Sequence, residues 1–580
     1  MRPLLSFYQR SFSSKTLSTK SSQFFRIPKE FFCLHFGAPS GIMFNKIFIF
    51  IFLNASIPKE DHFTMNQKKS QPFLRAQLDL FDTVVAFFCI AILCIWFVVN
   101  PERSSQVLSS IRNFLGDEMG SYYLLIGLGV FLCSLYLAFS RFGQIRLGNL
   151  KKPQYSNFQW GAMMFTSGLA ADILFYSCCE WMLYASDPHI AEMGAVQDWA
   201  ATYPLFHWGP IPWGFYVVLS VAFGFMLHVR KREKQKYSES CRPLLGNRVD
   251  GWAGRLIDLV AVFALLAGTA TTFSLATPLL SLAISRVAGI PQTTGLTILI
   301  LIVVCAIYTF AVFFGMKGVQ LSASCCTYLF FGLLAYVFFF GGETRFIVEA
   351  GITALGNLTQ NFIGLATWTD SMRTSSFPQN WTIFYWAYWM VWCVAVPFFI
   401  GTISKGRTIR QTILGGYLYG LAGTFTSFII LGNYGLGLQM HGKIDVLTAY
   451  SADGNLYQAI ISLLGHLPAS KFVLILLVLC MITFYSTTFD SITMVASSYT
   501  YKKLDHDQEP DRRVRLFWAI FLILLPVALL FSENSMANLQ TVSIIAAFPV
   551  GIIILMILAS FFKDASDYLK ENDPKSESDK

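Results

Sequence analysis

Charged residues are scarce in this sequence. Asp, Glu, Lys and Arg together make up 13% of its 580 residues, whereas hydrophobic residues make up 54%. Such a composition excludes an ordinary soluble protein. The 12 cysteines form no CxxC pair and lie mostly within apolar segments, as at Cys178 and Cys179, which favours buried free thiols over a disulfide framework. No Ser, Cys or carboxylate stands at a spacing from His207 that indicates a catalytic triad, so an enzyme is disfavoured.

Long apolar runs dominate the chain instead. Each is roughly twenty residues long, the length that crosses the hydrocarbon core of a bilayer. We therefore predict an all-α polytopic membrane protein with twelve transmembrane helices. The predicted spans lie near residues 80–99, 122–140, 158–184, 207–228, 255–283, 294–315, 324–342, 381–403, 411–434, 471–493, 515–532 and 540–562.

Basic residues concentrate in the even-numbered gaps between these spans. They are Arg141, Arg146, Lys151 and Lys152; Arg230, Lys231, Arg232, Lys234 and Lys236; Lys405, Arg407 and Arg410; and Lys502, Lys503, Arg512, Arg513 and Arg515. Because basic loops stay on the inner side, we predict a multi-pass protein of the cell (inner or plasma) membrane with both termini cytoplasmic. The net charge of +9 then indicates contact with anionic lipid and not with nucleic acid. The amphipathic segment 345–365 is too polar to cross, so we expect it flat on the outer surface.

The two ends of the chain differ from its apolar middle. Residues 1–64 form an N-terminal extension whose apolar run Ile47–Leu53 is too short to cross a membrane. We expect this extension to be disordered or to lie upstream of a functional start at Met65, with a cleaved targeting segment as the alternative. The membrane domain is predicted over 65–562, and 563–580 is predicted to be a short cytoplasmic tail.

Tryptophans gather in the stretch Phe377–Arg410. Its first two thirds can span a bilayer, and Trp386, Trp389 and Trp392 recur every third residue, so they lie on neighbouring strips of one helix. Leucine would be sufficient for simple contact with lipid, so the tryptophans indicate another role. Ring faces bind a cation that cannot donate hydrogen bonds, such as a trimethylammonium group. A second aromatic cluster is Leu205–Tyr216, where glycine and two prolines loosen the start of the fourth span. For any one tryptophan, a place in the interfacial aromatic belt is an equal alternative.

Two segments of this stretch, WTIFYWAYW and ISKGRTIR, resemble the signature helix of the betaine/carnitine/choline transporter family. The resemblance extends from about Leu80 to Phe562. It implies two inverted five-helix repeats, spans three to seven and eight to twelve, preceded by two N-terminal helices, with a substrate site near the midplane. It also implies a homotrimer. The substrate-binding residues that it implies are Trp208, Trp213, Tyr216, Phe175, Tyr388, Trp389, Trp392 and Asp172. Tyr388 is a departure, because many relatives have tryptophan there.

Asp172 lies in the third span, just after Gly168 and other small residues that permit an irregular backbone. A carboxylate at this depth indicates function, although a neutral acid that packs helices together is the alternative. A fixed anion would repel the carboxylate of betaine or carnitine and would attract choline. In the resemblance, betaine carriers have glycine here and proton-coupled choline carriers have aspartate. Other short segments of this sequence resemble the carnitine exchangers of the family. Those exchangers, however, have an arginine where this sequence has Cys326.

Adjacent hydroxyls in the tenth span suggest an ion site. Thr487 and Thr488 could bind sodium together with backbone oxygens, since neutral oxygens suit a monovalent cation. Hydrogen bonds back to their own helix are an equal alternative. The predicted ion-coupling set is Thr487, Thr488, Phe484, Thr166, Leu169 and Asp172.

These features predict a secondary active transporter without a prosthetic cofactor that takes up a small trimethylammonium compound by symport with Na⁺ or H⁺. Choline is the favoured substrate. A carnitine or betaine carrier, or a carnitine/γ-butyrobetaine-type exchanger, is the alternative. A polytopic membrane enzyme or sensor is the alternative from another class, and the sequence shows no polar catalytic cluster that would support it.

Overall fold

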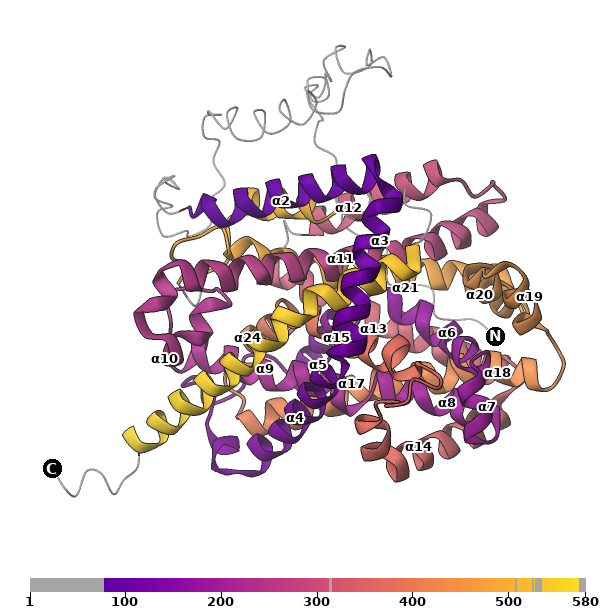
Figure 1. Ribbon diagram of the computed structural model, residues 1–580, viewed down its shortest axis with the longest axis horizontal. Helices are drawn as coiled ribbons and strands as arrows, with labels where there is room; N and C mark the ends of the chain where they lie inside the picture. The colour runs from indigo at the N-terminus through magenta and orange to yellow at the C-terminus, as the bar shows by residue number, and fades with distance from the viewer. Residues whose placement is uncertain (1–77, 312–314, 506–507, 524–525, 527–534, 573–580) are drawn as a thin grey trace, which may run out of the picture. The chain divides into compact units, whose positions relative to one another are not determined.

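The computed structural model describes residues 78–311, 315–505, 508–523, 526 and 535–572. Over these residues the regular structure is helical, with two isolated β-bridges, Leu78–Tyr501 and Arg146–Thr408 (Figure 1). Helices suit apolar segments in a bilayer, because a helix satisfies its backbone hydrogen bonds within one segment. The predicted N-terminal extension lies outside the described residues.

The α-helices, with the labels of Figure 1, are α2 (Leu80–Val99), α3 (Pro101–Asn113), α4 (Gly120–Phe139), α5 (Asn157–Gly168), α6 (Asp172–Ala185), α7 (Pro188–Met193), α8 (Val196–His207), α9 (Pro210–His228), α10 (Arg242–Leu245), α11 (Trp252–Ala288), α12 (Thr294–Ala311), α13 (Gly315–Phe340), α14 (Thr344–Thr367), α15 (Ile383–Trp392), α16 (Val396–Ile403), α17 (Ile409–Ser427), α18 (Asn433–Met440), α19 (Val446–Asp453), α20 (Leu456–Gly465), α21 (Ser470–Ser498), α22 (Arg512–Leu522) and α24 (Ser535–Glu571). Single 3₁₀ turns at Arg141–Gln144, Ser238–Cys241 and Gly246–Asp250, and π turns at Phe114–Glu118, Pro378–Thr382 and Phe428–Gly432, extend or connect them.

Each predicted span coincides wholly or in part with a helix or a pair of helices. By length and hydropathy, seven helices of the described part can cross a membrane, or up to nine if each of two bent pairs counts as one span. The apolar helix counted within α12, Thr294–Phe310, is slightly too short for this count. Most of the eleventh predicted span beyond Leu522 lies outside the described residues. The chain is thus a polytopic all-α protein, and the count of twelve stays a prediction. α24 continues past Phe562 to Glu571, so the beginning of the predicted tail is helical.

The basic gaps meet at one end of the helices. Arg146 of the second gap donates from Nη1 to the carbonyl oxygen of Gly406 in the eighth gap, at 2.6 Å. Lys503 of the tenth gap lies 2.6 Å from the carboxylate of Glu233 in the fourth. Such contacts place these gaps on the same side of any membrane that the helices cross. That this side is cytoplasmic stays a prediction from the positive charge.

The first, third and seventh gaps meet at another face. Arg373 pairs with Asp117, and the ring of His189 stacks on that of Trp368 with centroids 4.2 Å apart. The predicted surface segment forms α14, which packs along α8 at the edge of the bundle (Figure 1). These three odd-numbered gaps and the four basic even-numbered gaps therefore contact gaps of their own set, as alternating crossings require.

Asp370 fixes the loop that leads into the tryptophan-rich stretch. Burial raises the pKa of this carboxyl, but it accepts backbone N–H bonds from Thr374, Ser375 and Ser376 at 2.7–3.0 Å, and these donors hold its pKa well below the usual range. The turn Pro378–Thr382 then begins at a defined place. The same loop thus sets where α15 enters the bundle.

Candidate functional site

Residues 169–171 interrupt the third predicted span. α5 ends at Gly168 and α6 begins at Asp172, with a bend of 62° between the two helices. Leu169 has an extended backbone, φ −120° and ψ 122°. A Cβ at position 168 would approach the Trp213 ring to 3.0 Å, so only glycine lets that ring pack so close to the backbone. The predicted irregular backbone is present, and it releases carbonyl oxygens from helical bonding.

A second interruption lies within the tryptophan-rich stretch. α15 ends at Trp392 and α16 begins at Val396, with a bend of 50°. Pro397 occupies the second position of α16, where its missing N–H costs no helical hydrogen bond. The two broken helices are the first members of the two predicted sets of five. This correspondence supports the predicted repeats, in which interrupted helices flank the substrate.

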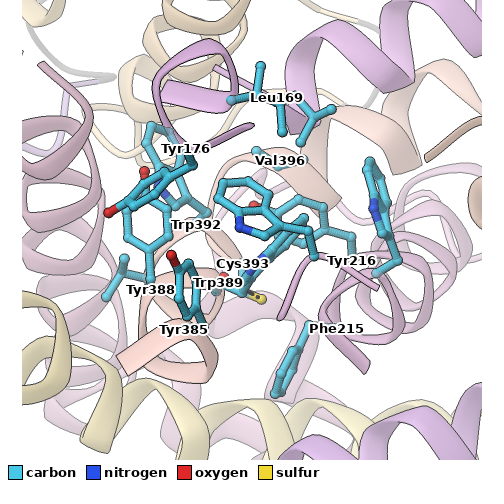
Figure 2. Close-up of a cluster of buried hydrophobic side chains, with 14 of the residues drawn as sticks. Leu169, Tyr176, Phe215, Tyr216, Tyr385, Tyr388, Trp389, Trp392, Cys393 and Val396 are labelled. Carbon is cyan, nitrogen blue, oxygen red and sulfur yellow. Dashed lines mark hydrogen bonds between the residues drawn. The ribbon is translucent and has the colours of Figure 1, made fainter. Parts of the chain in front are cut away.

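A small pocket lies between the two interruptions. Its lining includes six of the eight predicted substrate-binding residues: Asp172, Trp208, Tyr216, Tyr388, Trp389 and Trp392. Ser167, Gly168, Leu169, Ala170 and Thr488 complete it. Figure 2 shows the aromatic side chains of α9 and α15 gathered around one another in this region.

Trp389 occupies the centre of the aromatic group. Its ring centroid lies 4.8 Å from that of Tyr216, 5.5 Å from Trp208 and 5.6 Å from Trp213, with interplanar angles of 55–71°. All four side chains are at most 2% exposed. Of these four residues, Trp208, Tyr216 and Trp389 line the pocket. The pocket can therefore offer negative ring faces to a cation.

Two of the predicted substrate-binding residues do not line the pocket. Trp213 stands behind it and packs against Tyr216 and Trp389. Phe175 packs against Tyr176 and Tyr457, with ring centroids 5.3 Å away in each case. Trp213 thus supports rings that line the pocket, whereas Phe175 belongs to the surrounding core.

Asp172 brings a carboxylate into this aromatic pocket. It begins α6, is 3% exposed, and accepts hydrogen bonds at Oδ2 from Tyr388 and, at 3.2 Å, from Thr272 of α11. The hydroxyls of Tyr388 and Thr272 are themselves 2.9 Å apart. The N-terminus of a helix also favours negative charge. Tyr388 thus supplies a donor for the carboxylate.

The predicted ion-coupling oxygens come together beside the pocket. The hydroxyl of Thr488 donates to the carbonyl oxygens of Thr166 at 3.0 Å and Leu169 at 3.2 Å. That of Thr487 lies 3.4 Å from the Thr166 oxygen and 3.1 Å from that of Phe484. This group of neutral oxygens has the chemistry of a site for a monovalent cation. Asp172, which belongs to both predicted sets, lies at the far side of the same interruption.

The sequence indicates the hydroxyl cluster Thr269, Thr271, Thr272 and Ser274 of the fifth span as a candidate for a second ion site or for the lining. Within this cluster Thr272 donates to Asp172, a partner that the sequence did not indicate. Its contact with Asp172 joins residues 100 positions apart, so no local pattern could reveal it. Cys326 is buried on α13.

A sequence model described as the BCCT, betaine/carnitine/choline family transporter, matches residues 83–570. The chain belongs to the betaine/carnitine/choline transporter family. Family membership shows a multi-pass membrane transporter and excludes the enzyme alternative. It agrees with the resemblance predicted from the tryptophan-rich stretch.

Several named relatives in the family are similar over most of their length. A "Probable glycine betaine transporter" of Desulfitobacterium hafniense (strain Y51) is 31% identical over 476 residues, which cover 81% of this chain and 94% of that protein. The "Glycine betaine transporter OpuD" of Bacillus subtilis (strain 168) is 30% identical, with 85% and 95% covered. A "Carnitine transporter" of Acinetobacter baumannii is 28% identical, with 82% and 87% covered.

Proposed function

We propose that this family member takes up choline by symport with Na⁺ or H⁺. The observation that carries this proposal is the carboxylate of Asp172 in the lining of a pocket to which five aromatic side chains also contribute. The rings bind the trimethylammonium group, and Asp172 supplies an attractive negative charge. No prosthetic cofactor takes part.

The same carboxylate argues against betaine and carnitine. Both substrates carry an anion, which an ionised Asp172 would repel. Choline instead ends in a neutral hydroxyl, which can donate a hydrogen bond to the carboxylate. The names of the relatives favour betaine and carnitine, so these two compounds are the alternatives that an experiment must separate.

The two interruptions support a mechanism of alternating access. Substrate and ion would bind where α5–α6 and α15–α16 break, and one helix bundle would rock against the other around this fixed place. A sodium ion would replace the present hydrogen bonds from Thr487 and Thr488 as the partner of the Thr166 and Leu169 oxygens. If a proton is coupled instead, Asp172 would carry it, and its carboxylate would meet the substrate cation only when ionised.

Uptake into membrane vesicles tests the proposal. Labelled choline, betaine and carnitine are offered separately, with a sodium gradient or a pH gradient imposed alone. The proposal expects choline to accumulate against its gradient when one of these gradients is present. Accumulation of betaine or carnitine in place of choline would overturn the choice of substrate.

If sodium is the coupled ion, replacing Thr487 and Thr488 together with alanine should raise the sodium concentration for half-maximal uptake by about tenfold or more. Each hydroxyl ligand is worth about 1 kcal/mol, and 1.4 kcal/mol is tenfold. The measurement is choline uptake as a function of sodium concentration.

Thr359→Ala is the matched control for this double variant. Thr359 is exposed on α14, and its hydroxyl donates to the Leu355 carbonyl of its own helix. Its sodium dependence should equal that of the wild type. If the double variant kept the sodium dependence of the wild type and its choline uptake still followed the pH gradient, sodium coupling at this site would be excluded. Protons would then be the coupled ion.

A further inference from the structure

Four buried polar side chains form a connected group next to the pocket, and the proposed transport cycle does not use them. We call Glu180, Tyr184, His207 and Thr382 the buried network. The hydroxyl of Tyr184 donates to Glu180 Oε1 at 2.6 Å and lies 2.6 Å from His207 Nδ1. His207 Nε2 lies 3.0 Å from the Thr382 hydroxyl. Glu180, Tyr184 and His207 are wholly buried, and Thr382 is 2% exposed.

One pocket residue is bonded directly to this network. Trp208 Nε1 donates to Glu180 Oε2 at 2.7 Å. An indole N–H can only donate, so Glu180 is the acceptor whatever its protonation state. Within the described residues, the indole N–H groups of Trp213 and Trp389 have no hydrogen-bond partner. The Trp208 ring is therefore fixed by a hydrogen bond, whereas those two rings are fixed by packing.

The backbone around Trp208 explains why such a bond is needed. Trp208 caps the end of α8, and Gly209 and Pro210 follow as the chain turns into α9. A side chain at such a junction is not held by a continuous helix on both sides. The ring nevertheless meets Trp389 edge-to-face at 5.5 Å and 71° within the pocket. Rotation of the indole would open this contact.

The network also connects three helices above the pocket. Glu180 and Tyr184 lie on α6, and His207 ends α8. Thr382 ends the turn before α15, the helix that carries Trp389. The ring of His207 also stacks on Tyr385 of α15, with centroids 4.7 Å apart and planes 16° apart. The entry of α15 and the position of Trp208 are thus set by the same group of hydrogen bonds.

We propose that Glu180 is a positioning residue for substrate binding, because it holds the Trp208 indole in the pocket wall and anchors the buried network. This inference rests on the proposed function, in which Trp208 contacts the trimethylammonium group. Glu180 itself does not line the pocket and touches no substrate. Its effect reaches the substrate through Trp208 and the start of α15.

Glutamine and leucine at position 180 separate positioning from charge. The glutamine oxygen can accept from Trp208, and its NH₂ can donate to the Tyr184 oxygen. Tyr184 can then donate to His207 Nδ1, and His207 Nε2–H to Thr382, so every group keeps a partner. Leucine has a similar volume and offers no acceptor, so the Trp208 N–H and the Tyr184 hydroxyl lose Glu180.

The test measures equilibrium binding of labelled choline to the full chain in membranes. Glu180→Leu should weaken binding about tenfold, the effect of leaving one buried hydrogen-bond donor without its acceptor, while the uptake rate at saturating choline changes little. Glu180→Gln should restore affinity to within about twofold of the wild type. Wild-type affinity in Glu180→Leu would overturn the inference. Equal losses in both variants would also overturn it, since they would show that charge and not positioning matters.

A ligand-independent readout keeps this inference distinct from the proposed function. The ¹⁵N–¹H resonance of the Trp208 indole is assigned by its loss in Trp208→Phe. The chemical shift of this indole resonance should change in Glu180→Leu and should stay near the wild-type value in Glu180→Gln. A wild type that binds no trimethylammonium compound would refute the proposed function, and this resonance would still decide whether Glu180 fixes Trp208. An unshifted resonance in Glu180→Leu refutes the inference.

A further pair of variants decides the question if Glu180→Leu does not reach the membrane. Trp208→Phe removes a hydrogen bond together with part of the ring, whereas Trp389→Phe removes part of a ring whose N–H has no partner. Trp208→Phe should weaken choline binding more than Trp389→Phe does. An equal or smaller loss in Trp208→Phe would overturn the proposed role of Glu180.

Discussion

Replacing Trp389 with leucine is expected to lower the affinity for choline about 100-fold or more. A cation over a desolvated indole face is worth about 2 kcal/mol, and each aromatic pair contributes about 0.5–1.5 kcal/mol beyond its buried area. Trp389 contacts Trp208, Trp213 and Tyr216, so its loss removes one face and loosens three others. A total of about 3 kcal/mol corresponds to more than 100-fold. Equilibrium binding of labelled choline, at matched amounts of membrane-inserted protein, measures the change.

Trp252→Leu is the matched control for this variant. Trp252 begins α11 and is 78% exposed, so the same chemical change is made far from the pocket. Its affinity for choline should equal that of the wild type. Tight choline binding by a membrane-inserted Trp389→Leu protein would refute the aromatic pocket as the substrate site.

The helices could be predicted because hydropathy alone determines most of them. Runs of about twenty apolar residues have one stable form in a bilayer, so each predicted span meets a helix in the structure. Gly168 and the Gly209–Pro210 pair also predicted where backbone regularity fails. The interruption after Trp392 was not located within the predicted span 381–403, although Pro397 marks it. A proline follows such a break at the first turn of the next helix, so its position points to the residues before it.

The ring residues could be predicted, but their partners could not. Spacing along α15 brings Trp389 and Trp392 towards one side, and the resemblance added the rings of α9. The bond between Asp172 and Thr272 depends on how α6 packs against α11. Likewise, Glu180 and Tyr184 are four residues apart on one helix and their contact is local, whereas His207 and Thr382 come from other helices. Tertiary packing decides these pairs.

Replacing Asp172 with glycine is expected to reverse the substrate preference from choline to betaine. Two unit charges 4 Å apart interact by about 4 kcal/mol at an effective dielectric constant near 20. Losing half of this attraction should lower the affinity for choline about 30-fold. Betaine should gain about tenfold, because the hydroxyls of Tyr388 and Thr272 then become free to donate to its carboxylate. The N-terminus of α6 adds a favourable dipole for that anion. Competition between labelled choline and betaine in vesicle uptake measures the ratio.

Two further variants test the reason for this reversal. Asp172→Asn removes the charge but keeps an oxygen that accepts from Tyr388 and Thr272. This variant should therefore have a lower affinity for choline and an unchanged affinity for betaine. Adding Tyr388→Phe to Asp172→Gly removes one of the freed donors, and the gain in betaine affinity should then fall. If Asp172→Gly kept the wild-type preference, the carboxylate would not select the substrate, and the choice of choline over betaine and carnitine would lose its physical basis.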